Sequence, residues 1–354
     1  MKLYLSDLTY RYEMENLCRL FYPREDIEPV CTPPPETPVG LWANAALCHD
    51  ATLAFGRAGD GKKRCKSTLA LDPGLGEKEA ERCLAVVLYR ALCSLTGRTP
   101  QWGILTGVRP VKLFQTLSAD FEAKNPGEGD VLAAAEMCQR LLVSPDKIEL
   151  CRQSAEAERR CVGKISPRDF SLYISVPFCP TRCAYCSFVS HSIERAGKLV
   201  PDYLDALERE LDAIASLAKE FSLSLKSVYM GGGTPTILSP GQLSRLIDAV
   251  ARRFSLPSDG ELTVEAGRPD TLDREKLNAL HGGGVTRLAV NPQTLDDRVL
   301  EAIGRRHTAR QTLEAFALAR ECGFDNINMD LIVGLPGEDT DSVENTLRQV
   351  KELS

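Results

Sequence analysis

The run Leu172-Tyr-Ile-Ser-Val-Pro-Phe-Cys-Pro-Thr-Arg-Cys-Ala-Tyr-Cys-Ser-Phe188 decides how the rest of the chain is interpreted. It places Cys179, Cys183 and Cys186 in a C-x3-C-x2-C array. The residues from Ser171 to Phe178 alternate and are rich in β-branched and aromatic side chains, which predicts a strand. The cysteines then occupy the loop at the carboxyl end of that strand, where parallel α/β proteins place their chemistry.

Three cysteines at this spacing predict a metal centre. A structural zinc site normally has four ligands, commonly from two C-x2-C pairs, and the sequence has no second pair. A [4Fe–4S] cluster fits better, because three thiolates leave one iron open to a small molecule. The alternative is three incidental thiols in a chain with 13 cysteines. The spacing and the strand-loop context favour the cluster.

Length and composition set the outer limits. A chain of 354 residues with 43% hydrophobic content can form about two domains. No apolar run reaches the roughly 18 residues that span a bilayer, and the N-terminus lacks the apolar core of a signal peptide, so we expect a cytoplasmic protein with no membrane span. The net charge of −6 argues against a nucleic-acid partner.

Two regions are expected. Residues 1–167 contain no recognisable catalytic motif and are expected to form a smaller α+β accessory domain. Strands are predicted at 2–5 and twice within 51–71, and helices at 11–21, 77–96, 110–118, 129–142 and 145–161. Residues 168–354 alternate strands, at 225–230, 261–266, 285–290 and 326–332, with helices at 203–221, 240–254, 272–281, 296–303, 309–322 and 339–353. Repeated strand-helix units of this kind predict an α/β fold with a parallel sheet curled into a partial barrel.

Polar or glycine-rich residues follow the predicted strands. The run Gly231-Gly-Gly-Thr-Pro235 follows the second strand, Glu265 ends the third, Gln293 follows the fourth, and Asp330 ends the fifth, while Arg305 comes one helix later. The carboxyl ends of parallel strands share one edge, so these residues are predicted to meet in one site. Glycines there allow close backbone approach to a ligand.

These motifs carry a resemblance. The cysteine array, with Tyr185 just before its third cysteine, resembles the cluster loop of the radical S-adenosylmethionine (SAM) enzymes. Within that superfamily the chain is similar to the oxygen-independent coproporphyrinogen III oxidases (coproporphyrinogen dehydrogenases), in the branch with an additional N-terminal domain. The similarity covers residues 170–354 and is carried by Tyr173-x-x-x-Pro-Phe-Cys, Gly231-Gly-Gly-Thr-Pro-Thr236, the Gln293 to Arg305 spacing and Asp330-Leu-Ile-Val-Gly-Leu-Pro336.

The resemblance implies roles for individual residues. It places the [4Fe–4S] cluster on Cys179, Cys183 and Cys186, with Tyr173 near the cluster as the fourth member of the catalytic set. The residues that it implies for SAM are Tyr185 near adenine, Gly232, Gly233 and Thr234 at the methionine end, and Glu265, Gln293, Arg305 and Asp330 at the amine, ribose and carboxylate.

It also implies a reaction in heme biosynthesis. Two propionates of coproporphyrinogen III undergo oxidative decarboxylation to vinyl groups, giving protoporphyrinogen IX, through a 5′-deoxyadenosyl radical. The implied partners are the tetrapyrrole and a low-potential electron donor such as flavodoxin or ferredoxin. The alternative is a heme chaperone of the same superfamily, to which Ser187 and Phe188 after Cys186 are also similar. Because such barrels usually have a sixth strand, a chain ending at Ser354 is expected to form a barrel truncated at its C-terminal end.

Overall fold

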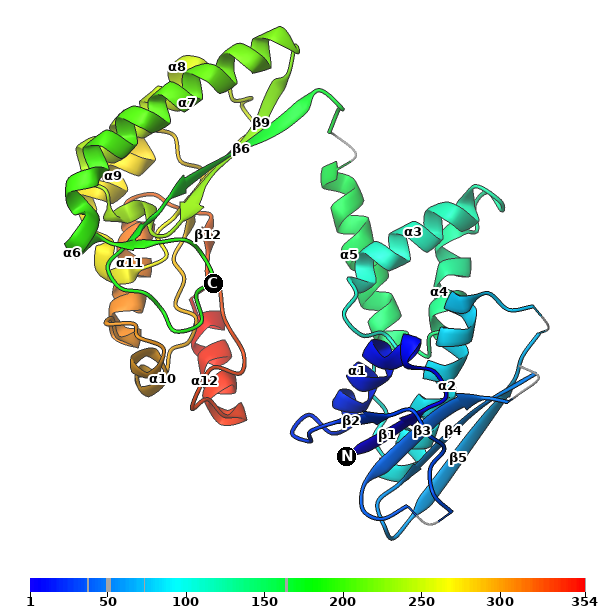
Figure 1. Cartoon of the computed structure of the whole chain (residues 1–354). Helices are drawn as coiled ribbons and strands as arrows, with labels where there is room; N and C mark the ends of the chain where they lie inside the picture. The colour runs from blue at the N-terminus through cyan, green and yellow to red at the C-terminus, as the bar shows by residue number, and fades with distance from the viewer. Residues whose placement is uncertain (37, 49–51, 73, 163–164, 354) are drawn as a thin grey trace. The chain divides into compact units, whose positions relative to one another are not determined.

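Two separate sheets organise the chain, one in each of the units Met1–Ile165 and Ser166–Ser354 (Figure 1). The computed structural model describes residues 1–36, 38–48, 52–72, 74–162 and 165–353. The assignment of residues 1–167 as an accessory domain and of 168–354 as the domain that carries the chemistry stays a prediction.

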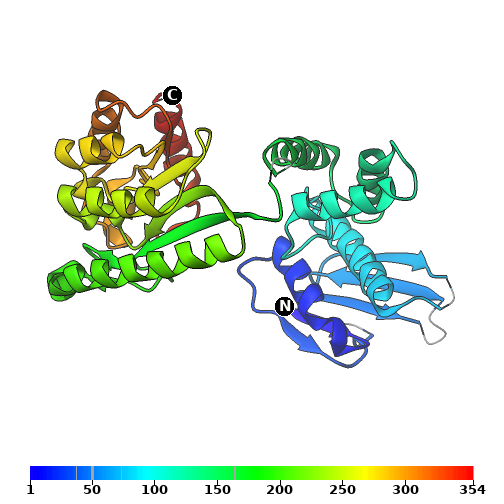
Figure 2. The ribbon, with the colours of Figure 1, turned by 90° about the horizontal axis from the view of Figure 1, so that it is seen from above.

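The N-terminal unit is built on a mixed sheet with the strand order β2-β1-β3-β4-β5. Its strands are β1 (Lys2–Leu5), β2 (Glu28–Val30), β3 (Trp42–Leu47), β4 (Leu53–Gly59) and β5 (Arg64–Ala70). Helices α1 (Arg11–Phe21) and α2 (Glu77–Thr96) pack on one face, as Figure 2 shows. A Cβ on Gly56 of β4 would lie 2.3 Å from the carbonyl oxygen of Val87, so glycine is what lets α2 lie this close to the sheet.

Three further helices complete this unit around a core of their own. They are α3 (Pro110–Glu122), α4 (Gly129–Gln139) and α5 (Pro145–Val162). Phe114 and Met137 are fully buried at the centre of this core. All the helices predicted in the N-terminal region are present, and the hairpin predicted within 51–71 is β4 and β5.

The C-terminal unit is an open parallel sheet with helices on its outer face. Its strands β6 (Asp169–Val176), β9 (Ser224–Gly232), β10 (Glu261–Glu265), β11 (Arg287–Ala289) and β12 (Ile327–Asn328) lie side by side in chain order. The helices are α7 (Val200–Glu220), α8 (Pro240–Arg253), α9 (Arg274–Gly282), α10 (Asp297–Ala302), α11 (Ala309–Glu321) and α12 (Thr340–Lys351). Within the described residues β6 and β12 do not pair, so the sheet is a partial barrel and the predicted α/β class is confirmed.

Alternation along the strands separates the two faces of this sheet. In β6, Leu172, Ile174 and Val176 are buried in the core beneath the helices, whereas Tyr173 is 56% exposed on the opposite, inner face. Tyr229 of β9 stacks on Tyr173, with ring centroids 5.8 Å apart. The inner face is therefore the wall that a ligand would meet.

In the C-terminal unit, two details differ from the sequence predictions. The strand predicted at 326–332 is only Ile327–Asn328, and the chain then runs as a loop in which Leu331 makes a single bridge to Gln293. The loop that follows β6 contains a short pair, β7 (Phe178–Cys179) with β8 (His191–Ser192), and the short helix α6 (Ile193–Ala196). Among the described residues, no helix has both the length and the apolar character needed to cross a membrane.

Candidate functional site

One cavity lies at the carboxyl ends of the parallel strands. It contains about 660 Å³ of empty space, part of it open to solvent. Its lining includes Cys179, Cys183, Cys186, Tyr185, Gly232, Gly233, Thr234, Glu265, Gln293, Arg305 and Asp330. The structure thus brings together every predicted site residue except Tyr173, which lies on the inner face of β6.

The loop that carries the cysteines is fastened to neighbouring elements. The Thr234 hydroxyl donates to the sulfur of Cys179 at 3.4 Å. The Thr181 hydroxyl donates to the carbonyl oxygen of Gly304 at 3.0 Å, and the Ala184 N–H donates to that of Ile303, also at 3.0 Å. These bonds hold the loop in place through contacts with segments far away in the sequence.

The three thiols lie around the cavity without converging on one point. Within the described ranges, no three His, Cys, Asp or Glu side chains are close enough together to hold a single metal ion. A four-iron cluster makes a different demand, because each cysteine binds a different iron. Cys179, Cys183 and Cys186 line one cavity, which is compatible with a cluster of this kind.

The glycine run is required by the packing of the chain itself. The N–H of Gly233 donates to the carbonyl oxygen of Val176, and that of Thr234 to Phe178, both at 2.8 Å. Gly232 has a φ of +103°, which favours glycine. The N–H groups of Gly233 and Thr234 are thus not free for a ligand, because they join the end of β9 to the strand and loop that lead to Cys179.

Replacing Gly233 with alanine should therefore destabilise this junction. The added Cβ would lie 2.6 Å from the carbonyl oxygen of Phe178 and 2.9 Å from that of Val176, and backbone atoms cannot move aside cheaply. We expect the free energy of unfolding to fall by about 1–3 kcal/mol, measured by urea denaturation. Gly241→Ala in α8, where nothing lies within 4 Å, is the control and should not destabilise the protein. Equal effects of the two substitutions would show that Gly233 is not constrained by this contact.

Glu265 ends β10 on the inner face and accepts a hydrogen bond from the Tyr229 hydroxyl at 2.5 Å. Burial raises the pKa of Glu265, and the nearby carboxylate of Asp330 raises it further, while the Tyr229 bond lowers it. Burial also raises the pKa of Tyr173, with the charge of Glu265 adding to the effect. A cation beside Glu265 and Asp330 would relieve their repulsion, so this part of the cavity suits an ammonium or sulfonium group.

Gln293 is held in an unusual backbone conformation. Its φ is +68°, rare for a residue other than glycine. Its N–H donates to the carbonyl oxygen of Asp330 at 3.0 Å, and its own carbonyl accepts from Ile332 at 2.9 Å. The strand-like bridge that fixes Gln293 also places Asp330 at the cavity, and strain of this kind is often retained at functional sites.

Arg305 is 8% exposed and joins three parts of the site. Its Nη1 donates to the carbonyl oxygens of Asn291 at 2.6 Å and Gly267 at 3.2 Å. Its Nη2 donates to the Tyr185 hydroxyl at 3.3 Å, while its Nε has no hydrogen-bond partner in the described part of the chain. Burial raises the pKa of Tyr185, and the Arg305 charge opposes that shift.

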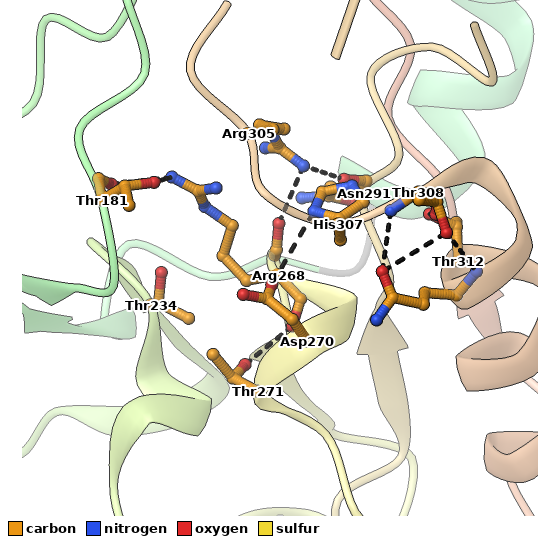
Figure 3. A network of polar contacts seen from close by, with 12 residues as sticks. Thr181, Thr234, Arg268, Asp270, Thr271, Asn291, Arg305, His307, Thr308 and Thr312 are labelled. Carbon is orange, nitrogen blue, oxygen red and sulfur yellow. Dashed lines mark hydrogen bonds and ion pairs between the residues drawn. The ribbon is translucent and has the colours of Figure 1, made fainter. Parts of the chain in front are cut away.

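Figure 3 shows a second buried arginine, Arg268, reaching Thr181 of the cysteine loop, and His307 between Arg305 and Asp270. The Nδ1 atom of His307 lies 3.7 Å from an Asp270 carboxylate oxygen, which is an electrostatic contact and too long for a hydrogen bond. Burial lowers the pKa of His307, and the contact with His307 lowers the pKa of Asp270. The positive charge around the cysteine loop is therefore carried by Arg268 and Arg305, and not by His307.

Residues 173–350 match the radical SAM superfamily. This region contains the cysteine loop and the residues at the ends of β9, β10, β11 and β12 that line the cavity. The chain belongs to the radical SAM superfamily. Members of this superfamily use a [4Fe–4S] cluster together with SAM.

Relatives place the chain more closely. It is 33% identical over 347 residues to the oxygen-independent coproporphyrinogen-III oxidase-like protein HemZ of Bacillus subtilis, covering 96% of this chain and 68% of HemZ. The heme chaperone HemW of the same organism is 42% identical over 184 residues, covering 52% of this chain and 47% of HemW. Among solved structures, coproporphyrinogen III oxidase (HemN) from Escherichia coli matches with 32% identity and a TM-score of 0.49, over 56% of this chain and 45% of HemN.

The donor set of this radical SAM site fits both cofactors. Arg268 and Arg305 are 3% and 8% exposed, and neither forms an ion pair with a carboxylate among the described residues. A buried charge is costly, so an anionic group bound in the cavity would stabilise these two guanidinium groups. Thiolates bound to a cluster and the carboxylate of SAM would both supply negative charge here.

Sequence reasoning did not assign seven of the residues that line the cavity, and two of them, Arg268 and Asn291, make contacts that matter to the site. The Asn291 side chain accepts from the Asp330 N–H at 3.2 Å, so it positions a residue that was predicted. Both follow strands β10 and β11 within stretches already recognised as strand ends. Their position in those stretches was the available signal, but Glu265 and Gln293 in the same stretches were assigned to the site instead.

Proposed function

We propose that the protein catalyses the oxygen-independent oxidative decarboxylation of coproporphyrinogen III to protoporphyrinogen IX. The observation that carries this proposal is the match to the coproporphyrinogen oxidase-like HemZ, which runs over 96% of this chain and so includes both units. The chain spans 68% of HemZ and about half of the heme chaperones that it matches.

The residues around the cavity have separate tasks in this proposal. Cys179, Cys183 and Cys186 hold three irons of the cluster and leave the fourth for the amine and carboxylate of SAM. The reduced cluster and SAM together supply a 5′-deoxyadenosyl radical. The negative pair Glu265 and Asp330 orients the positively charged end of SAM.

The remaining polar groups fix the rest of SAM and border the substrate. Gln293 and Arg305 bind its ribose and carboxylate, and Tyr185 contacts the adenine. The stacked rings of Tyr173 and Tyr229 lie on the inner face, where Tyr229 donates to Glu265 of the cavity, and supply aromatic contact area for the apolar body of a tetrapyrrole.

The same overall reaction takes place at each of the two propionates. One hydrogen atom would pass from the β-carbon to the 5′-deoxyadenosyl radical, giving 5′-deoxyadenosine; the carboxylate would leave as carbon dioxide and one electron would pass to an acceptor, so that a –CH2–CH2–COO⁻ group becomes –CH=CH2. A low-potential donor such as flavodoxin or ferredoxin supplies the electron that starts each turn. Since the site must exclude water and oxygen from a carbon radical, the buried base of the cavity is the proposed place of hydrogen abstraction.

Heme delivery is the second candidate. The observation that favours it is the higher identity to HemW, 42% against 33% for HemZ, although over 184 residues only. A chaperone would use the same cluster and SAM site but would retain heme and leave propionates intact.

Anaerobic incubation of the reconstituted protein with dithionite, SAM and coproporphyrinogen III tests the two. We expect protoporphyrinogen IX and carbon dioxide in a 1:2 ratio, with SAM consumed, by chromatography and mass spectrometry. SAM cleavage without vinyl formation, together with stoichiometric retention of added heme, would replace the decarboxylase proposal with the chaperone. The same incubation without SAM is the control.

A further inference from the structure

Arg268 is a buried cation in contact with the cysteine loop, and none of the roles proposed so far uses it. It follows β10 in the stretch Gly267-Arg-Pro-Asp270 and is 3% exposed. It lines the same cavity as the three cysteines. A guanidinium at this depth requires a reason, because its desolvation costs several kcal/mol unless its surroundings compensate.

The contacts of Arg268 are concentrated on the loop between the first two cysteines. Its Nη2 donates to the carbonyl oxygen of Thr181 at 2.7 Å, to the Thr181 hydroxyl at 2.8 Å and to the sulfur of Cys183 at 3.3 Å. Figure 3 shows the side chain extended toward Thr181. Its Nη1 is buried and has no partner among the described residues. One end of the guanidinium is thus bound to the loop, and the other is still a free donor.

Cys183 is the most constrained of the three cysteines. It is 9% exposed, and it is the only one of the three whose sulfur accepts a hydrogen bond from a charged group among the described residues. The sulfur of Cys179 instead accepts from the neutral hydroxyl of Thr234. The electrostatic environment therefore differs between Cys183 and Cys179.

A positive donor at a cluster thiolate has a predictable effect. Reduction adds one negative charge to the cluster, and a nearby cation that donates a hydrogen bond stabilises the more negative state. The reduction potential of the cluster is therefore higher with the cation than without it. The same bonds orient the cysteine, so loss of the cation should also loosen the loop.

We propose that Arg268 is a positioning residue for the cluster: it fixes the loop at Thr181 and Cys183 and raises the reduction potential of the bound [4Fe–4S] cluster. The free Nη1 is the donor that remains for the cluster or for the anionic end of its ligand. This inference rests on the cluster and SAM chemistry of the proposed function but is independent of the choice between decarboxylase and chaperone.

The test is a potential measurement on the reconstituted full chain, without tetrapyrrole. R268Q removes the charge, and R268K keeps a charge without the forked donor geometry. R306Q is the control, because it removes a charge from an exposed arginine that pairs with Glu194. Midpoint potentials come from an anaerobic titration followed by electron paramagnetic resonance. We expect the potential to decrease in the order wild type, R268K, R268Q, and R306Q to match the wild type.

Two results would overturn the proposal. One is R268Q with a full complement of iron and sulfide and an unchanged potential. The other is R268K with wild-type potential and wild-type cluster content. This second result decides the question if circular dichroism shows that R268Q does not fold as the apoprotein. A folded R268Q that cannot retain its cluster supports the positioning role. These measurements do not require turnover, so the potentials can be interpreted even if the wild-type protein does not decarboxylate coproporphyrinogen.

Discussion

Replacement of Cys183 with alanine is expected to abolish both the iron–sulfur absorbance and the reductive cleavage of SAM. Cys183 is buried at the base of the cavity, so no solvent-side ligand can readily take its place, and two thiols cannot hold the cluster with one iron open. We expect at most residual iron and sulfide after anaerobic reconstitution, and a loss of 5′-deoxyadenosine production to background. Iron and sulfide assays, visible spectra and chromatography measure these quantities.

The matched control for this experiment is Cys138→Ala. Cys138 is an exposed cysteine of α4, in the N-terminal unit and outside the cavity. It should keep the full cluster and full SAM cleavage. Wild-type cleavage in the Cys183→Ala protein would show that the cluster has been assigned to the wrong thiols.

The sheet and its site edge could be predicted because each rests on a local pattern. Alternation in β6 and the apolar core of β9 define strands, and helices of 3.6-residue period separate them. Once the strands are parallel, the polar residues that follow them must share one edge. That geometry brings Glu265, Gln293 and Asp330 to one cavity, as predicted.

Other features depend on contacts that no local pattern contains. Strand β3 reads Trp-Ala-Asn-Ala-Ala-Leu, and its alanines lack β propensity; they are buried because α2 packs closely over the sheet. The loop after β12 reads as a continued strand because its residues are apolar. Its course is instead set by the bridge to Gln293.

The glycine run shows how a correct motif can have a second physical cause. Its residues line the cavity as predicted, yet a Cβ at Gly232 or Gly233 would first meet the chain itself, at Ser175 and Phe178. Arg268 is the converse case. Its contact with Cys183 spans 85 positions in the sequence, so only the folded chain reveals that the cluster loop has a cation at its side.

Substitution of Arg305 by glutamine is expected to weaken SAM binding while the cluster still assembles. Arg305 holds the carbonyls that follow β10 and β11 and the hydroxyl of Tyr185, and its charge lies in the cavity with no carboxylate paired to it among the described residues. Losing a charge-assisted contact with the carboxylate of SAM costs about 2 kcal/mol, which is roughly a 30-fold higher Kd. Anaerobic equilibrium dialysis with cluster-loaded protein measures the Kd, and iron and sulfide assays confirm loading.

Arg306→Gln separates this effect from a general loss of positive charge. Arg306 is the next residue, is 69% exposed at its side chain and pairs with Glu194, so its removal changes the net charge equally but leaves the cavity intact. It should bind SAM as the wild type does, because an exposed charge is screened by solvent and salt. If Arg305→Gln also binds SAM normally, Arg305 is only a structural tie between strand ends, and the carboxylate of SAM must be held by another cation of the cavity, for which Arg268 is the remaining buried candidate.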